Sequence, residues 1–250
     1  MSGHSKFHNI KLRKGKADAQ RGALFTKLSK EIIVAARSGS PDPEANYRLK
    51  VAVEKAREGN MPLDTIKRAI DRATGQAGGS DIEELRYEGY GPHGVAVVID
   101  AATDNRNRTA GELRFLFSKH GGGLGETGSV GWMFDPVGIV EIDSAGRDEE
   151  TLTETVLVDG VVDLEYEADA STVYTQPGNL AAVRDALRER GLRVSDAFLG
   201  MRAKSRIELR GGALAQAIAF LEALDEHEDV QRVFSNLEVS DAALAEASAG

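Results

Sequence analysis

The first third of the chain, after a polar opening, shows apolar residues at helical spacing. From Leu24 to Ile32 these residues form one stripe along a predicted helix. Lys27 and Lys30 fall away from that stripe, so we expect both side chains to face solvent.

Two more helices are predicted in this region. Ser38-Gly39-Ser40 ends the first helix, and Asp42-Pro43 is typical of an N-cap followed by proline at the first helical position. Pro62 opens a third helix and Gly75 closes it, which predicts a small bundle. The bases of its second and third helices alternate with acids, so we expect ordinary ion pairs on the helix surface. These bases are Lys50, Lys55, Arg57, Lys67, Arg68 and Arg72, and the acids are Glu54, Glu58, Asp64 and Asp71.

Beyond a predicted flexible hinge at 76–80, short strands alternate with helices. Expected elements include a strand at 94–101, a helix at 105–120 and separate strands at 130–134 and 137–142. The order from Val137 to Leu199 is β-α-β-β-α-β, the ferredoxin-like arrangement. The flanking pieces cannot each close a good sheet, so we expect them to join into one discontinuous unit.

The predicted fold class is therefore multidomain α and α+β. An N-terminal three-helix basic bundle is followed by two ferredoxin-like α+β domains, with the third domain inserted in the second. The expected boundaries are 1–75 for the basic helical domain with its flexible arm, 82–134 plus 204–240 for the discontinuous domain, 135–203 for the inserted acidic domain, and 241–250 for a frayed tail.

Charge divides the chain into two parts of opposite sign. The formal net charge is −9. Residues 1–75 hold 16 Lys and Arg against 8 Asp and Glu, a surplus of +8, so the remainder carries −17. A basic segment attracts a polyanion that an acidic body repels. We therefore expect the N-terminal part to contact nucleic acid first, chiefly through phosphate groups.

The first thirty residues carry the strongest candidates for phosphate contacts, because they hold eight bases and one acid. The segment 2–16 contains no acid and few apolar residues, so self-repulsion favours a mobile arm until a polyanion neutralises it. The predicted nucleic-acid-binding residues here are Lys6, Lys11, Arg13, Lys14, Lys16, Arg21, Lys27 and Lys30.

A second candidate site lies at the start of the expected helix 105–120, which Asp104 or Asn105 can cap. Arg106 and Arg108 fall in its first turn, where the helix dipole disfavours cations. Two interpretations are open. The arginines and free N–H groups form an anion site for a phosphate, or the arginines are held by structural ion pairs with Glu88 or Glu112.

The sequence offers little for catalysis or metal binding. It contains no cysteine, which excludes disulfides and thiolate zinc sites. The segment Gly123–Gly128 matches GxGxxG, but an expected helix precedes it and an expected strand follows it, the reverse of the dinucleotide-binding order. The five histidines lack metal-ligand spacing. We expect no enzymatic activity, no cofactor and no metal.

Two alternatives from other classes remain: an enzyme whose arginines hold an anionic substrate, and an adaptor whose acidic face at 141–169 docks a basic protein. The N-terminus lacks the apolar run of a secretory signal, and no stretch approaches the roughly 18 apolar residues of a membrane span. We expect a cytoplasmic protein that has no contact with membranes.

Short motifs along nearly the whole chain resemble the YebC/PmpR family, whose mitochondrial branch includes the translational activator of cytochrome c oxidase subunit I. The motifs are Gly3-His4-Ser5-Lys6-Phe7, Arg21-Gly22, Phe25-Thr26-Lys27-Leu28, Asn60-Met61-Pro62, Tyr87-Glu88-Gly89-Tyr90-Gly91-Pro92, Thr103-Asp104-Asn105-Arg106-Asn107-Arg108-Thr109 and Gly128-Ser129-Val130 with Trp132 and Phe134. The family usually has lysine where Gln20 and Ala23 stand.

The resemblance implies the three-domain plan and a non-enzymatic regulator of gene expression that binds nucleic acid. One version is a DNA-binding transcriptional regulatory protein. The alternative is a ribosome-associated translation factor that binds ribosomal RNA and relieves stalling on proline-rich stretches.

Overall fold

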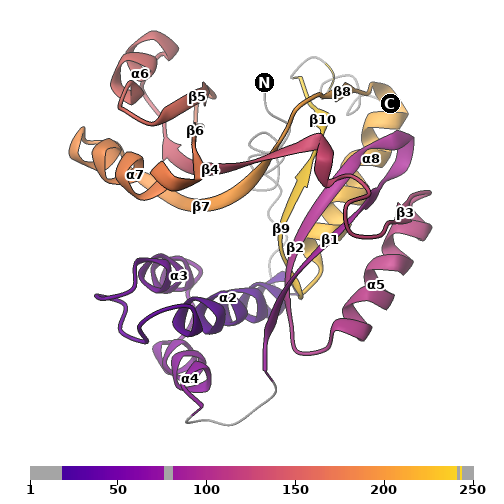
Figure 1. Ribbon diagram of the computed structural model, residues 1–250, viewed down its shortest axis with the longest axis horizontal. Helices are drawn as coiled ribbons and strands as arrows, with labels where there is room; N and C mark the ends of the chain where they lie inside the picture. Colours follow the sequence, from indigo (N-terminus) through magenta and orange to yellow (C-terminus); the bar gives the residue numbers. More distant parts are fainter. Residues whose placement is uncertain (1–18, 76–80, 241–242, 244–250) are drawn as a thin grey trace.

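The computed structural model describes residues 19–75, 81–240 and 243. The chain is a mixed α+β protein with an N-terminal helical region, as the sequence predicts (Figure 1). The helical region consists of α2 (Ala19–Arg37), α3 (Tyr47–Glu58) and α4 (Leu63–Ala73). Its core is aliphatic and small, with Leu28, Ile32 and Leu49 among the buried side chains. It also includes Ile82 and Ala102, so the helical region packs against the first sheet.

The start of α3 differs from the prediction. The structure begins this helix at Tyr47, and the Asn46 side chain accepts a hydrogen bond from the Leu49 N–H as its N-cap. Asp42 instead stabilises a turn, because its carboxylate accepts the Glu44 N–H and its carbonyl accepts the Ala45 N–H. Asn46 also donates to the carbonyls of Ala35 and Ser40, which Asp42 could not do without a side-chain donor.

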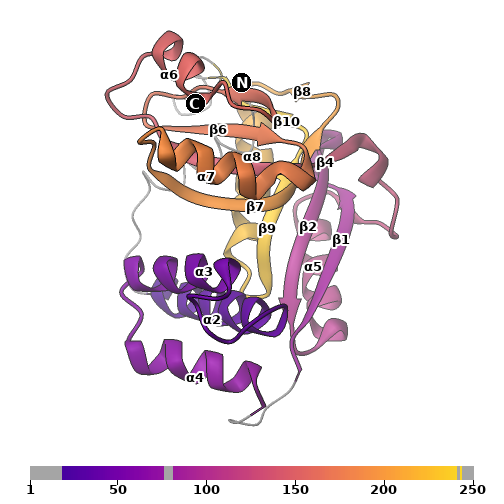
Figure 2. The same ribbon diagram turned by 60° about the vertical axis from the view of Figure 1, so that its left-hand side comes forward.

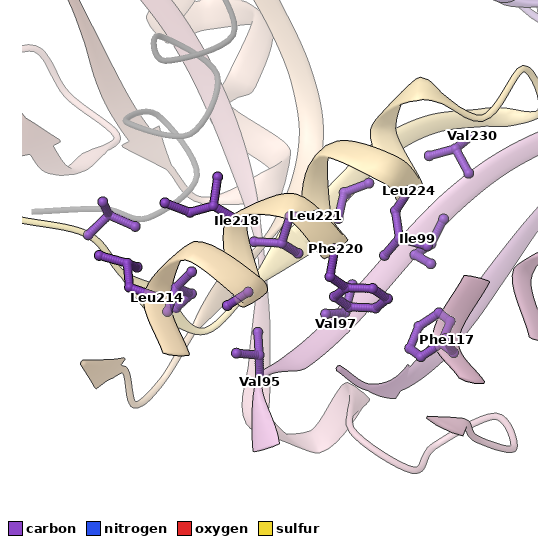
Figure 3. Packing of buried hydrophobic residues seen from close by; sticks show 14 of the residues in the cluster. Val95, Val97, Ile99, Phe117, Leu214, Ile218, Phe220, Leu221, Leu224 and Val230 are labelled. Carbon is purple, nitrogen blue, oxygen red and sulfur yellow. The ribbon is translucent and has the colours of Figure 1, made fainter. Parts of the chain in front are cut away.

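The first sheet has the strand order β3-β1-β2-β9 and antiparallel pairing. Its strands are β1 (Glu83–Tyr90), β2 (Ala96–Thr103), β3 (Gly123–Leu124) and β9 (Val230–Ser235). Helices α5 (Arg106–Lys119) and α8 (Gly211–Glu226) cover one face. Figure 3 shows the core they enclose, in which Phe117 and Phe220 meet edge to face with ring centroids 4.9 Å apart.

The second sheet has the strand order β5-β6-β4-β7, again antiparallel throughout. Its strands are β4 (Phe134–Asp143), β5 (Val161–Glu165), β6 (Ala170–Thr175) and β7 (Val194–Ala203), and its helices are α6 (Glu149–Val156) and α7 (Leu180–Glu189). A short parallel pair, β8 (Ile207–Glu208) and β10 (Leu237–Glu238), lies beside the first sheet. Within the residues that the structure describes, 3-10 helices also occur at Pro92–Gly94, Gly131–Met133 and Pro177–Asn179.

Strand β4 contributes side chains to two cores, because successive side chains of a strand point to opposite faces of the sheet. Val137 and Ile139 pack with Ala96 and Phe234 of the first sheet, whereas Val140 and Ile142 pack beneath α6 and α7. The two sheets therefore share an apolar contact. Figures 1 and 2 show the helical region below the second sheet and beside the lower end of the first sheet. A cavity of about 730 Å³ lies between these three parts.

Several expected elements need correction. The residues expected as a strand at 130–134 contain the 3-10 helix Gly131–Met133, and β4 is one continuous strand from Phe134. Strand β1 is absent from the sequence-based prediction. The ferredoxin-like description and the domain boundaries stay predictions. The predicted hinge 76–80 lies outside the described residues. Of the predicted tail 241–250, only Ala243 is described, and it is buried against the first-sheet core.

Candidate nucleic-acid interface

The N-terminal candidates divide according to what the structure describes. Lys6, Lys11, Arg13, Lys14 and Lys16 lie outside the described residues. Arg21 belongs to α2, and its side chain also lies outside the description. Of these eight candidates, the structure describes the side chains of Lys27 and Lys30.

Lys27 and Lys30 turn inward, so the prediction that both face solvent is wrong. The Lys30 ammonium is buried against the Asp229 carboxylate and lies 3.2 Å from the Glu228 carbonyl. Lys27 donates to the Asp225 carbonyl and lies 3.7 Å from the Asp225 carboxylate. Asp225 belongs to the last turn of α8, and Asp229 belongs to the turn that joins α8 to β9. The two lysines therefore fasten α2 to the first sheet.

Asp229 also pairs with Arg108, one of the two arginines of the second candidate site. The Arg108 guanidinium donates to both Asp229 oxygens, at 3.0 and 3.2 Å, and to Asp104 at 3.2 Å. The hydroxyls of Thr109 and Thr103 lie 2.6 and 3.3 Å from Asp229 Oδ2. Arg108 is thus held by a structural ion pair, but its partner is Asp229 rather than Glu88 or Glu112.

The surroundings of Asp229 determine its protonation. Burial alone raises the pKa of this fully buried carboxyl. The hydrogen bonds from Lys30, Thr109 and Arg108 stabilise the charged carboxylate and therefore lower the pKa. Their effect is larger than that of burial, so the pKa of Asp229 falls to about 2. The carboxylate is therefore charged at neutral pH and balances two cations from different parts of the chain.

Arg106 has a different environment from Arg108. The Asn105 side chain caps α5 by accepting a hydrogen bond from the Arg108 N–H. Arg106 is exposed in the first turn of the same helix. Its carbonyl accepts a hydrogen bond from the Tyr87 hydroxyl at 3.3 Å. Within the described parts of the chain, no ion pair engages the Arg106 guanidinium. Because Arg108 is committed to Asp229, Arg106 is the more available of the two for an outside anion.

Glu88 orders the loop that precedes β4 instead of pairing with an arginine of α5. Its carboxylate accepts the N–H groups of Val130 at 2.9 Å and Gly131 at 2.6 Å. Burial raises the pKa of Glu88, but these backbone N–H groups outweigh that effect and hold the pKa below its ordinary value.

A second group of ion pairs joins the helical region to both sheets. Lys55 of α3 pairs with Asp196 of β7 and lies 3.5 Å from Glu31 of α2. Arg232 of β9 lies 2.9 Å from Asp196 and 3.8 Å from Glu31. Burial raises the pKa of Asp196, but Arg232 and Lys55 outweigh it and lower that pKa. These four side chains fix the three parts of the molecule against one another.

The expected surface pairs of the helical region are replaced by other contacts. Lys55 takes part in the group above, and Lys50 pairs with Glu44 at 3.0 Å. Arg57, Lys67 and Arg68 are exposed, and no ion pair joins them to an acid among the residues that the structure describes. These three cations are not among the phosphate-binding residues predicted from the sequence, because we expect them there to pair with neighbouring acids. Alternating charge along a helix does not show which side chains are actually paired.

Asp229 and two neighbouring side chains form a group of three potential metal ligands, but these residues already make hydrogen bonds to one another. Oxygen and nitrogen atoms of Glu112, His227 and Asp229 lie within 4.8 Å of one another. The Asp229 N–H donates to His227 Nδ1, so Nε2 carries the ring proton and donates to Glu112 at 2.9 Å. In this arrangement neither ring nitrogen has a free lone pair for a metal.

Comparison with known proteins gives the family. The model of the TACO1/YebC N-terminal domain matches residues 5–76, and that of the TACO1/YebC second and third domain matches residues 82–237. The chain belongs to the TACO1/YebC family, which confirms the resemblance. Among the described residues, no helix has the length and apolar character needed to cross a bilayer.

Relatives match over nearly the full length. A probable transcriptional regulatory protein of Herpetosiphon aurantiacus is 50% identical over 96% of this chain and 96% of its own length. One of Pelotomaculum thermopropionicum is 47% identical over 96% of this chain and all of its own. The crystal structure of a conserved hypothetical protein from Aquifex aeolicus has a TM-score of 0.83 and 41% identity, and the match covers 92% of this chain and 95% of that one.

Proposed function

We propose that this chain is a non-enzymatic, cytoplasmic regulator of transcription that binds nucleic acid through its basic N-terminal part. The observation that carries the proposal is the charge division of a chain whose relatives are named as probable transcriptional regulatory proteins. The bases Lys6, Lys11, Arg13, Lys14, Lys16 and Arg21 supply the first phosphate contacts. The acidic face at 141–169 stays clear of the phosphates.

The helical region supports this proposal with exposed cations of its own. Arg57, Lys67 and Arg68 extend the positive surface onto α3 and α4, and Arg106 adds one at the edge of the first sheet. Lys27, Lys30 and Arg108 contribute through position: their contacts with Asp225 and Asp229 hold α2 and α5 in place. A firmly held helix lets a basic segment act on a fixed register of phosphates.

Salt dependence tests the mechanism. If about six phosphates are neutralised, log K falls with log salt with a slope near −5. Replacing the five arm bases with glutamine reduces that slope by up to about 5. The triple variant Arg57→Gln, Lys67→Gln, Arg68→Gln reduces it by about 0.9 for each phosphate, among those six, that these cations contact. The matched control replaces three exposed cations of the acidic part, Arg114, Lys119 and Arg210, and leaves the slope unchanged. A nearly salt-independent affinity contradicts the proposal.

Crosslinking in cells, followed by sequencing of the bound DNA and RNA, identifies the polymer. A transcriptional regulator yields enriched DNA sites that disappear in the arm variant. Enrichment of ribosomal RNA alone favours the translation-factor alternative and refutes transcriptional regulation. Recovery of neither polymer refutes nucleic-acid binding as a whole.

A further inference from the structure

The single tryptophan of the chain, Trp132, stands out on the acidic body. It occupies the 3-10 helix Gly131–Met133 and is 67% exposed, although Val130 and Phe134 on either side are buried. Large aromatic side chains at the surface are typical of binding sites when they are held in place.

The backbone around Trp132 is held by hydrogen bonds at several points. The buried Glu88 carboxylate accepts the N–H groups of Val130 and Gly131. The Met133 carbonyl accepts the Lys204 N–H at 2.9 Å, and the Met133 N–H donates to Val130. The indole N–H of Trp132 donates to the Ser129 carbonyl at 3.2 Å. The ring is therefore presented in a fixed position, and its faces, rather than its N–H, are left for a partner.

Two neighbours extend this surface. Tyr90 at the end of β1 is 40% exposed, and its hydroxyl lies 3.7 Å from the Met133 sulfur. The Lys204 ammonium lies 2.9 Å from the Trp132 carbonyl and 3.3 Å from Asp135. Both members of the Lys204–Asp135 pair are about half exposed or more, so water and salt weaken it and a phosphate can compete for the ammonium.

We propose that Trp132 is a stacking platform for an unpaired base of the nucleic acid, with Lys204 contacting the adjoining phosphate. An exposed aromatic face beside a cation is the combination that single-stranded nucleic acids use. A protein partner would favour apolar surroundings, yet the charged pair Lys204–Asp135 lies at the Trp132 backbone carbonyl. The inference rests on the proposed function and adds a second contact to it.

The platform lies far from the helical region. Strand β1 runs from Glu83, beside that region, to Tyr90, beside Trp132. Seven steps of about 3.3 Å separate the two ends by roughly 23 Å. One nucleic acid that contacts both Trp132 and the helical region therefore spans a distance comparable to the length of β1, about 23 Å.

Trp132 also reports on its own site, because the chain has no other tryptophan. The experiment titrates the full chain with fluorescein-labelled 15-nucleotide dT and U strands and with a 15-base-pair duplex. Anisotropy of the label measures binding, and tryptophan emission is recorded with unlabelled strands. We expect single strands to quench Trp132 at saturation, whereas the duplex binds without quenching. Trp132→Ala weakens single-strand binding about 5- to 100-fold, and Trp132→Phe recovers part of the loss.

The matched control is Phe115→Ala, which removes another aromatic side chain, 64% exposed, from α5 and leaves single-strand affinity unchanged. Single strands that bind by anisotropy without quenching Trp132 overturn the platform but leave the proposed function intact. Equal losses for Trp132→Ala and Phe115→Ala also overturn it. Absence of binding by every strand and duplex refutes the platform and the proposed function together. Circular dichroism of each variant establishes that it is folded, and the wild-type quenching result needs no variant.

Discussion

At the scale of single residues, Asp229 shows how tertiary contacts change the role of a basic side chain. From the sequence, Lys30 is a candidate phosphate ligand and Arg108 is either a phosphate ligand or a member of an ion pair, and both contact this one buried carboxylate. Lys30 and Asp229 are 199 positions apart in the chain, so no local spacing connects them. The sequence could predict that these cations need anions, but it could not predict which side chain would supply the negative charge.

Replacing Asp229 tests this assignment. Asp229→Asn leaves Lys30 and Arg108 facing a neutral amide, and removal of one partner from a buried pair costs about 3–5 kcal/mol. We expect the urea midpoint to fall accordingly. The control is Asp104→Asn, which removes the exposed partner of the same Arg108 and costs about 1 kcal/mol or less. Equal losses for the two variants would show that Asp229 has no special role.

Acid should act on the same carboxyl. The pKa of Asp229 is about 2 in the folded protein and 3.8 in the reference state, so the unfolded chain binds this proton more readily. The ionised Asp229 carboxylate contributes about 2 kcal/mol to the free energy of unfolding. This contribution is present well above pH 3.8 and is lost as the pH falls from about 4 to 2. Unfolding free energies at pH 6 and 2.5 should therefore differ less in Asp229→Asn than in the wild type. The same pH dependence in both contradicts this prediction.

At the scale of elements, hydrophobic periodicity predicted the helices and most strands, and it failed where polar contacts decide. Strand β1 (Glu83–Tyr90) is largely exposed and polar, so its pattern lacks a clear apolar face. The apolar residues at 130–134 look like a strand, but the Glu88 carboxylate draws the N–H groups of Val130 and Gly131 into a turn. That long-range carboxylate could not be seen in the local pattern.

The N-cap of α3 offers a test at this scale. Asn46→Ala removes the hydrogen bond to the Leu49 N–H and leaves the carbonyls of Ala35 and Ser40 without their amide donor. The Ala35 carbonyl keeps the Ser38 hydroxyl as a donor. Loss of a cap costs about 1 kcal/mol, and loss of the bond to the Ser40 carbonyl raises the expected cost to about 2 kcal/mol. Thermal unfolding followed by circular dichroism measures it. Asp42→Ala, at the position that the sequence favoured as the cap, should cost about 0.5 kcal/mol. A larger effect at Asp42 would restore the sequence-based assignment.

At the scale of the whole molecule, sequence reasoning found the division into a basic helical part and an acidic α+β body, but not how the parts are joined. The division follows from composition and element order, which are local properties. The joining depends on Glu31, Lys55, Asp196 and Arg232, which come from α2, α3, β7 and β9 and line or border the central cavity. These charges come together only in the tertiary structure, because their four elements are far apart in the chain.

This arrangement predicts that Asp196 controls the relative positions of the three parts. Asp196→Asn removes the carboxylate through which β7 holds Lys55 of α3, so this charge attraction between the helical region and the second sheet is lost and the two parts can separate. Small-angle X-ray scattering should show a larger radius of gyration than in the wild type. The control Asp163→Asn weakens the Arg202 pair within the second sheet and should leave the radius unchanged. An unchanged radius in Asp196→Asn, with the variant still folded, would mean that the apolar contacts of Ile82 and Ala102 hold the parts together without the ion pairs.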